Sequence, residues 1–228
     1  MFTRGLVYCA ALLGLSTAYA APHYARSNDS FPNPSAQQVM AIEQQAKGRL
    51  SNSPPPKTLS QAGVANFQLI AFNENLEVKF FEEIISNITN HVPGFITPKS
   101  SSRSVADILE VLKTVKAQEE LHALTATNTL QHFNASLIPV PCTYNFPTTS
   151  LEDALNLAET LTAVVLGTLQ DAEQSFAQNG DDGPLGEFAY DYVELQRHTS
   201  DIIPSHSDNE RASSSKGSVP EKTADSVV

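Results

Sequence analysis

A glutamate and a histidine three residues apart interrupt an otherwise apolar helical stripe near the middle of this 228-residue chain. At this spacing Glu119 and His122 can reach one point beside the helix. Carboxylate and imidazole groups are suitable ligands for iron or manganese. An E-x-x-H pair is also common on solvated helix faces, so the pair alone is weak evidence for a metal site. Glu120 falls on another face with Lys113 and Lys116, and we expect it to be solvated.

Glutamates also interrupt the apolar stripes of two other expected helices. Glu74 and Glu77 lie at mid-stripe in the preceding helix, and Glu159 lies at mid-stripe in the following one. Burying an ionised carboxylate without a partner is costly, so such groups are paired, protonated or bound to metal. Carboxylates at matching depths on three helices therefore favour a pair of divalent cations. Glu77 has an alternative interpretation, in which it lies at the edge of the stripe and pairs with a lysine.

Helices must position these residues, and four start signals with polar capping residues define them. The expected ranges are 35–50, 58–90, 104–133 and 150–178. Strand signals are scarce, because the β-like run 136–147 contains three prolines. The sequence therefore predicts an all-α bundle.

The connection between the last two long helices bears on topology. Residues 134–149 can span about 53 Å at ~3.3 Å per residue. Helix 150–179 is about 45 Å long at ~1.5 Å per residue. The connection is long enough to run the whole length of the bundle, which favours a crossover, although long loops also occur without crossing.

The two ends of the chain differ in composition from its middle. Residues 1–20 combine an early positive charge, a short apolar run and small residues, which is typical of a secretory signal peptide. We expect residues 21–57 to contain the short helix and a proline-rich linker, and residues 58–199 to form the bundle. Residues 200–228 are rich in serine and charge and are predicted to be disordered. The expected location is extracellular, with the cell wall included.

Composition argues against some partners. The formal charge is −11, or −12 once Arg4 leaves with the signal peptide, whereas nucleic acids and anionic membranes attract basic proteins. No segment has the roughly 20 apolar residues that a membrane span needs. Cys142 would be the single cysteine of the mature chain, either a buried thiol or an intermolecular bond. Acceptor tripeptides for glycosylation begin at Asn28, Asn87 and Asn134.

Four stretches carry a resemblance to a known family: "NFQLIAFNENLEVKFFEEI", "KAQEELHAL", "PVPCTYNFP" and "LNLAETLTAVVLG". They resemble the ferritin-like superfamily, and in particular the secreted fungal ferritin-like proteins of late sexual development and stress response. The resemblance covers about residues 64–177. It implies a dinuclear iron or manganese centre with one Glu from the first helix, E-x-x-H from the second, one Glu from the third and E-x-x-H from the fourth.

Carried over residue by residue, the resemblance implies ligands on three helices. They are Glu74, Glu119, His122 and Glu159. Phe81 stands where many ferritins have a tyrosine. The fourth helix departs from the pattern, because segment 185–198 is only about half as long as helix 150–179 and offers Glu194 and His198 four residues apart. With Glu77, these two are additional candidate ligands for a centre that is incomplete.

Three functional hypotheses follow. The first is a secreted ferritin-like protein of development or stress response with an iron or manganese centre, whose enzymatic activity stays open. The second is a non-catalytic structural or interaction bundle at the cell surface without metal. The third is a defective fragment that aggregates. For the first two, self-association through the groove beside the short fourth helix, or through Cys142, is expected.

Overall fold

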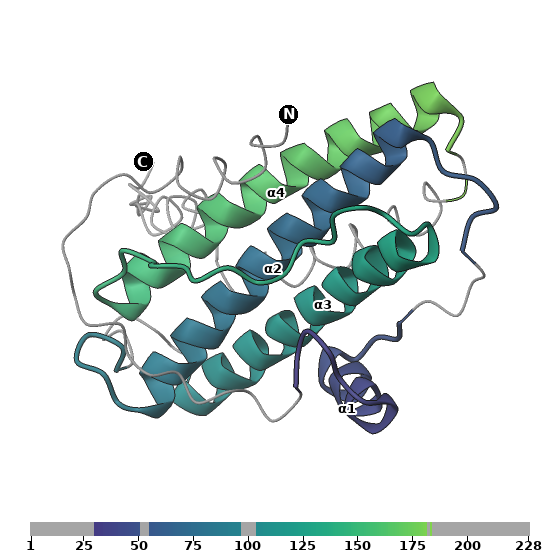
Figure 1. Cartoon of the computed structure of the whole chain (residues 1–228). Helices are drawn as coiled ribbons and strands as arrows, with labels where there is room; N and C mark the ends of the chain where they lie inside the picture. The colour runs from purple at the N-terminus through teal and green to yellow at the C-terminus, as the bar shows by residue number, and fades with distance from the viewer. Residues whose placement is uncertain (1–29, 51–54, 97–103, 182, 184–228) are drawn as a thin grey trace, which may run out of the picture.

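The computed structural model describes residues 30–50, 55–96, 104–181 and 183, and this part of the chain is helical without strands (Figure 1). Its helices are α1 (Ala36–Ala46), α2 (Gln61–Thr89), α3 (Val105–His132) and α4 (Leu151–Asn179). The all-α prediction is confirmed. No helix in these ranges is long and apolar enough to cross a membrane. The expected signal peptide, Asn28, segment 185–198 and the tail lie outside the described residues.

Capping residues define most of the helix ends. Ser35 and Ser104 each form the predicted capping box with the side chain three positions later. The predicted start of α2 at Thr58 is wrong: Ser60 is its N-cap, because the Ser60 hydroxyl accepts the N–H of Gly63. The expected end of the first helix near residue 50 is also wrong, since Lys47 adopts a left-handed conformation with φ of 56°.

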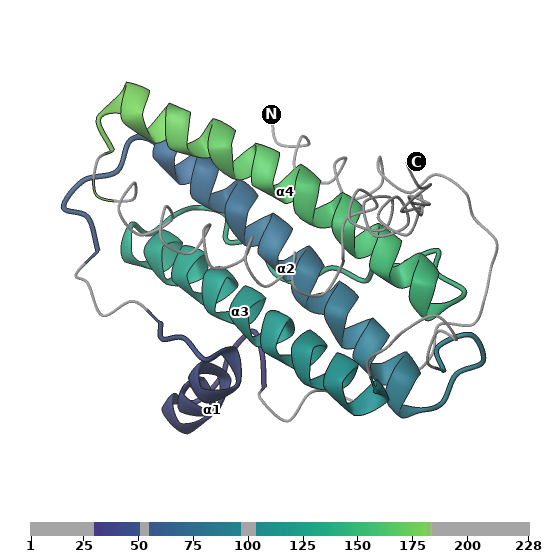
Figure 2. The same ribbon diagram turned by 180° about the vertical axis from the view of Figure 1, so that it is seen from behind.

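The long helices form a layer in which α2 lies between α3 and α4 (Figures 1 and 2). Both α3 and α4 run antiparallel to α2 and therefore parallel to each other (Figure 1). A parallel pair cannot be joined by a tight hairpin, and residues 133–150 run back along the bundle to connect them (Figure 1). The predicted crossover is confirmed. Within the described ranges the backbone of α4 packs closely on α2, whereas α3 and α4 approach each other only through side chains of the shared cores.

Two contacts fix the crossover and the start of α4. The ring of Phe146 packs edge-on against Phe80 of α2, with ring centroids 5.0 Å apart. Gly94 has φ of +90°, and a Cβ at this position would lie 2.3 Å from the carbonyl oxygen of Thr149. The Gly94 carbonyl accepts the N–H of Leu151 at 2.9 Å. Only glycine allows this close approach between the end of α2 and the beginning of α4.

The bundle has two apolar cores with a polar layer between them. One core gathers Phe80, Phe81, Ile84, Ile88, Phe95, Ile108, Leu112, Val115, Phe146, Leu151, Ala154 and Ala158. The other gathers Phe67, Ile70, Ala71, Ala126, Leu130, Val165, Leu169, Ala172 and Phe176. Each long helix contributes to both cores. The polar residues between them therefore lie at the same depth on α2, α3 and α4.

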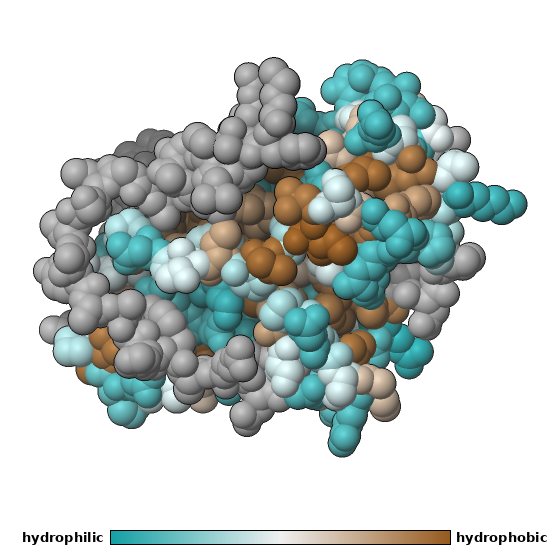
Figure 3. All heavy atoms as spheres, viewed as in Figure 1, coloured by the Kyte–Doolittle hydropathy of each residue, from teal (hydrophilic) through white to brown (hydrophobic). Residues whose placement is uncertain are grey.

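The outer surface has apolar features of its own. Helix α1 buries Ile42 and Ala46 against α3. On the face shown in Figure 3, apolar side chains are visible among polar ones in the half where α2 begins. Leu69, Leu137 and Val140 are exposed, although each is large and apolar. Self-association stays a prediction.

Candidate metal centre

Two antiparallel helices bring a carboxylate, a second carboxylate and an imidazole to one point. The Nδ1 atom of His122 lies 3.0 Å from Oε2 of Glu119 and 3.5 Å from Oε2 of Glu74. The ligand atoms of the three residues all lie within 4.8 Å of one another. Ligands about 2.1 Å from a shared ion are separated by about 3–3.5 Å in octahedral or tetrahedral geometry. The observed spacing is therefore close to that of a metal site.

These carboxylates are buried more completely than ordinary acidic side chains. Glu74 is 2% exposed and Glu119 is fully buried. Within the described chain, Oε1 of Glu119 has no hydrogen-bond donor, and the only group near Oε2 of Glu74 that could donate is the imidazole of His122, at the long distance of 3.5 Å. A buried oxygen that lacks a partner loses its hydration without replacement. The arrangement is chemically unsatisfied as it stands.

The electrostatics of the cluster favour protonation. Burial raises the pKa of Glu119 to about 7, against the opposing effect of its hydrogen bond with His122. Burial also raises the pKa of Glu77 well above its usual range, and the charges of Glu119 and Glu74 raise it further. Burial acts to lower the pKa of His122, but its hydrogen bonds to Glu119 and Glu74 outweigh this and hold that pKa well above 6.5. A bound cation would compete with these protons for the same oxygen and nitrogen atoms.

Glu77 joins the layer from α2, one turn after Glu74. It is 1% exposed, which rules out the interpretation of Glu77 as a residue at the solvated edge of the stripe. The hydroxyl of Thr162 on α4 lies 3.5 Å from Oε1 of Glu77 as a long hydrogen-bond donor. Oε2 of Glu77 has no partner among the described residues.

The sequence pattern placed Glu159 in the polar layer, but Thr162 occupies that position in the structure. Glu159 is exposed and lies outside the group formed by Glu74, Glu119 and His122. The buried face of α4 instead contains Ala158, Thr162 and Val165. Many other positions of this helix are also apolar, so the sequence pattern does not select one face. The small side chains spaced along α4 were the signal that could have identified its buried face, since small residues allow close helix packing.

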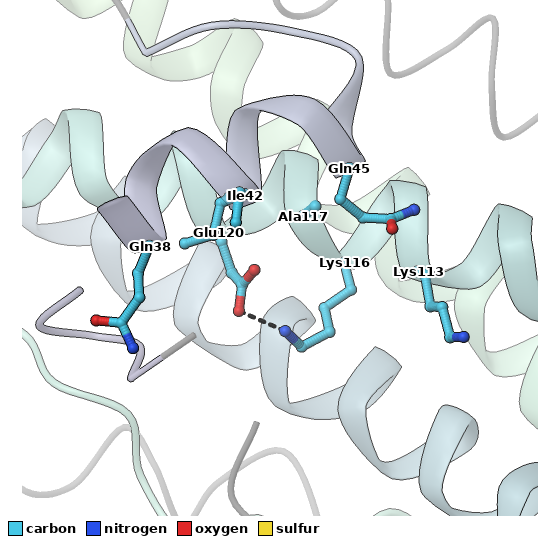
Figure 4. Close-up of a pocket in the computed structure, with 8 residues that line it drawn as sticks. Gln38, Ile42, Gln45, Lys113, Lys116, Ala117 and Glu120 are labelled. Atoms are coloured by element: carbon cyan, nitrogen blue, oxygen red, sulfur yellow. Dashed lines mark hydrogen bonds and ion pairs between the residues drawn. The ribbon is translucent and has the colours of Figure 1, made fainter. Parts of the chain in front are cut away.

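The expectation that Glu120 is solvated is wrong. Glu120 is 1% exposed, beneath α1, and forms an ion pair with Lys116 one turn earlier on α3 (Figure 4). The pair borders a pocket of about 320 Å³ between α1 and α3, with Gln38 and Gln45 at its sides. Polar residues lie on this face of α3 because α1 covers it with a partly polar surface of its own.

Comparison with known families accounts for this architecture. A family model described as a ferritin-like domain matches residues 60–180, which is more than half of the chain. The chain belongs to the ferritin-like domain family. No curated protein and no solved structure was found to match it. The family match begins and ends with the bundle, from the N-cap of α2 to the end of α4.

The donor set of this ferritin-like domain fits iron or manganese. Two carboxylates and one imidazole are the hard oxygen and borderline nitrogen ligands that these ions accept. The buried oxygens without donors are the atoms that a cation would satisfy. Glu194 and His198 lie outside the described residues. Of the glycosylation candidates, Asn134 is exposed after α3 and Asn87 is half-buried within α2, and their modification stays a prediction.

Proposed function

We propose that this ferritin-like protein binds iron or manganese in a dinuclear centre between α2, α3 and α4. One observation carries the proposal: Glu74, Glu119 and His122 converge in a buried layer between two apolar cores, and Oε1 of Glu119 has no donor among the described residues. Protonation would also neutralise such a cluster, and an imidazolium–carboxylate hydrogen bond has a similar N···O separation, so the measurement of metal content below is what distinguishes the two.

The chain's own residues supply binding and orientation. Glu119 and His122, three positions apart on α3, would hold the ion from that helix, and Glu74 would hold it from α2. When bound, iron or manganese supplies redox chemistry at this point. The surrounding Phe and Ile side chains exclude water, which strengthens the attraction between cation and carboxylate.

The test is the metal content of the purified full chain, measured by elemental mass spectrometry beside a double variant with Glu119→Ala and His122→Ala. We expect iron or manganese at about one to two per chain in the natural protein and a loss to background in the variant. Circular dichroism must show the same helix content in both. Unchanged metal content in the double variant would place the ion elsewhere.

A metal-free result in both proteins, with helicity intact, would favour the alternative function, a structural or interaction bundle with a polar core. The observation that favours this alternative is the small contribution of α4 to the polar layer. Helix α4 presents the hydroxyl of Thr162 to the layer rather than a carboxylate, and in the described part of the chain its backbone does not pack closely on α3.

We further propose that the protein is exported and acts in development or stress response at the cell surface. The support is the signal-like composition of residues 1–20, the acidic charge and the resemblance to secreted fungal ferritin-like proteins. N-terminal sequencing of protein recovered from culture medium tests this. We expect the chain to start near Ala21, and an intact Met1 would contradict export by this route.

A further inference from the structure

The strongest unexplained feature of the polar layer is a second buried carboxylate on α2. Glu74 and Glu77 are three positions apart, as are Glu119 and His122 on the antiparallel helix α3. Each helix thus directs an i, i+3 pair into the same layer. Glu77 is not a member of the three-residue group, yet it is as buried as the two carboxylates of that group.

In the described ranges, the surroundings of Glu77 supply one weak donor and a single positive group, the imidazole of His122, which already lies against Glu119 and Glu74. Thr162 reaches Oε1 at 3.5 Å, the outer limit of a hydrogen bond, and Oε2 has no partner in the described ranges. The charges nearest in effect are the carboxylates of Glu119 and Glu74. A carboxylate in apolar surroundings beside two others needs a positive group.

Glu119 offers a way to share that positive group. Its Oε2 atom lies toward His122, while its Oε1 atom is buried without a donor. One carboxylate can therefore serve a first ion through Oε2 and a second through Oε1. Helix α4 supplies no carboxylate to the polar layer, since Glu159 is exposed and Thr162 occupies the buried position.

We propose that Glu77 is a ligand of the second cation, with Glu119 shared between the two ions. Helix α2 would then supply the carboxylate that elsewhere in the superfamily comes from the third bundle helix, which corresponds to α4 in this chain. This inference rests on the proposed function. It adds a ligand assignment specific to this chain: two adjacent helices hold both ions, and α4 contributes a hydroxyl.

The experiment is a titration of the metal-free full chain with Mn²⁺, followed by calorimetry and electron paramagnetic resonance. The natural protein is expected to bind about two ions per chain, and magnetic coupling between them would broaden the manganese signal. Glu77→Gln has nearly the same shape as the protonated acid. It should bind about one ion, show the hyperfine pattern of isolated Mn²⁺, and weaken the second site about 10- to 100-fold or more.

Glu159→Gln is the matched control, because it makes the same change on α4 at an exposed position. It should keep two coupled ions. If Glu77→Gln fails to fold, a Glu77→Asp variant is used instead, and its manganese signal is compared with the coupled signal of the natural protein. The shortened carboxylate should weaken only the second site.

The outcomes separate the two proposals. Two coupled ions in Glu77→Gln, or a loss in Glu159→Gln instead, would overturn the assignment of Glu77 and leave the metal centre standing. One ion of equal affinity in both the natural protein and Glu77→Gln would overturn it as well. No Mn²⁺ or Fe²⁺ bound by the natural protein would overturn the proposed function together with this inference.

Discussion

Two neighbouring residues on α3 solve the same electrostatic problem differently. Glu119 and Glu120 are both almost fully buried, at 0% and 1% exposure. Glu120 lies under α1 and pairs with Lys116, a cation from its own helix (Figure 4). Glu119 lies in the polar layer beside Glu74 and His122, and one of its oxygens has no donor. A buried carboxylate with its own lysine is structural, whereas two buried carboxylates that share one titratable imidazole indicate a site for an added cation.

A third carboxylate completes the comparison. Asp181, 5% exposed, accepts the backbone N–H of Ser60 at 2.8 Å and its hydroxyl at 2.6 Å. These donors lie at the beginning of α2, where the helix dipole favours negative charge. Among the described residues, hydrogen bonds and the helix dipole stabilise Asp181. In the described part of the chain, Glu119 has neither the lysine partner of Glu120 nor the pair of hydrogen-bond donors and helix dipole that stabilise Asp181.

The largest effect should come from removing the permanent cation. Lys116→Met leaves Glu120 buried without this partner and should lower the free energy of unfolding by about 3–5 kcal/mol. Adding Glu120→Leu should restore most of the loss. Urea denaturation measures both effects. Metal content per folded chain should be unchanged, and a loss of metal in the double variant would mean that the two faces of α3 are not independent.

Next in size is the pH dependence of the metal-free protein. The pKa values of Glu77 and Glu119 are raised in the folded state, so the folded chain binds these protons more tightly than the unfolded chain. The raised pKa of His122 acts in the same direction. This stability is present below about pH 4.5 for the carboxyls and is lost as pH rises through about 7 for Glu119.

Between pH 5 and 8 the chelator-treated protein should lose on the order of 2 kcal/mol from Glu119 alone. Denaturation at several pH values checks this. Saturating Mn²⁺ should remove or reverse the slope, because the metal binds the deprotonated groups. A metal-free protein that gains stability from pH 5 to 8 would contradict the account of the layer.

The same glutamate-to-glutamine substitution at adjacent positions should change the stability of the fold in opposite directions. In metal-free protein at pH 8, Glu119→Gln removes a buried charge whose desolvation the hydrogen bond from His122 does not fully offset, and it should stabilise the fold by about 1–2 kcal/mol. Glu120→Gln breaks the ion pair with Lys116 and should destabilise it by a similar amount. Thermal melts of both variants measure the difference. Equal signs would show that Glu119 has a permanent cation after all.

The smallest effect belongs to Asp181. Asp181→Ala removes two hydrogen bonds from Ser60 and a negative charge at the start of α2, and should cost about 1–2 kcal/mol. Metal binding should be unaffected, because Asp181 lies at the end of the bundle. Reduced metal content in folded Asp181→Ala protein would show that the position of α2 is transmitted to the polar layer.

Local sequence rules predicted the helices and part of the candidate site. Capping boxes at Ser35 and Ser104 defined helix starts because their hydrogen bonds depend on residues three positions apart. The i, i+3 spacing placed Glu119 and His122 together for the same reason. The predicted N-cap of α2 was wrong by two residues, since Ser60 is held by hydrogen bonds to Asp181, which lies far away in the sequence.

The sequence by itself determined an acidic, helical chain with a glutamate–histidine pair on an apolar stripe and a connection long enough to cross the bundle. Tertiary structure decided the rest. Whether Glu120 is solvated depended on where α1 packs, and whether Glu159 or Thr162 enters the polar layer depended on the rotation of α4. Helix periodicity defines which residues share a face, but when a helix is apolar on several sides only its packing partners select the face that is buried.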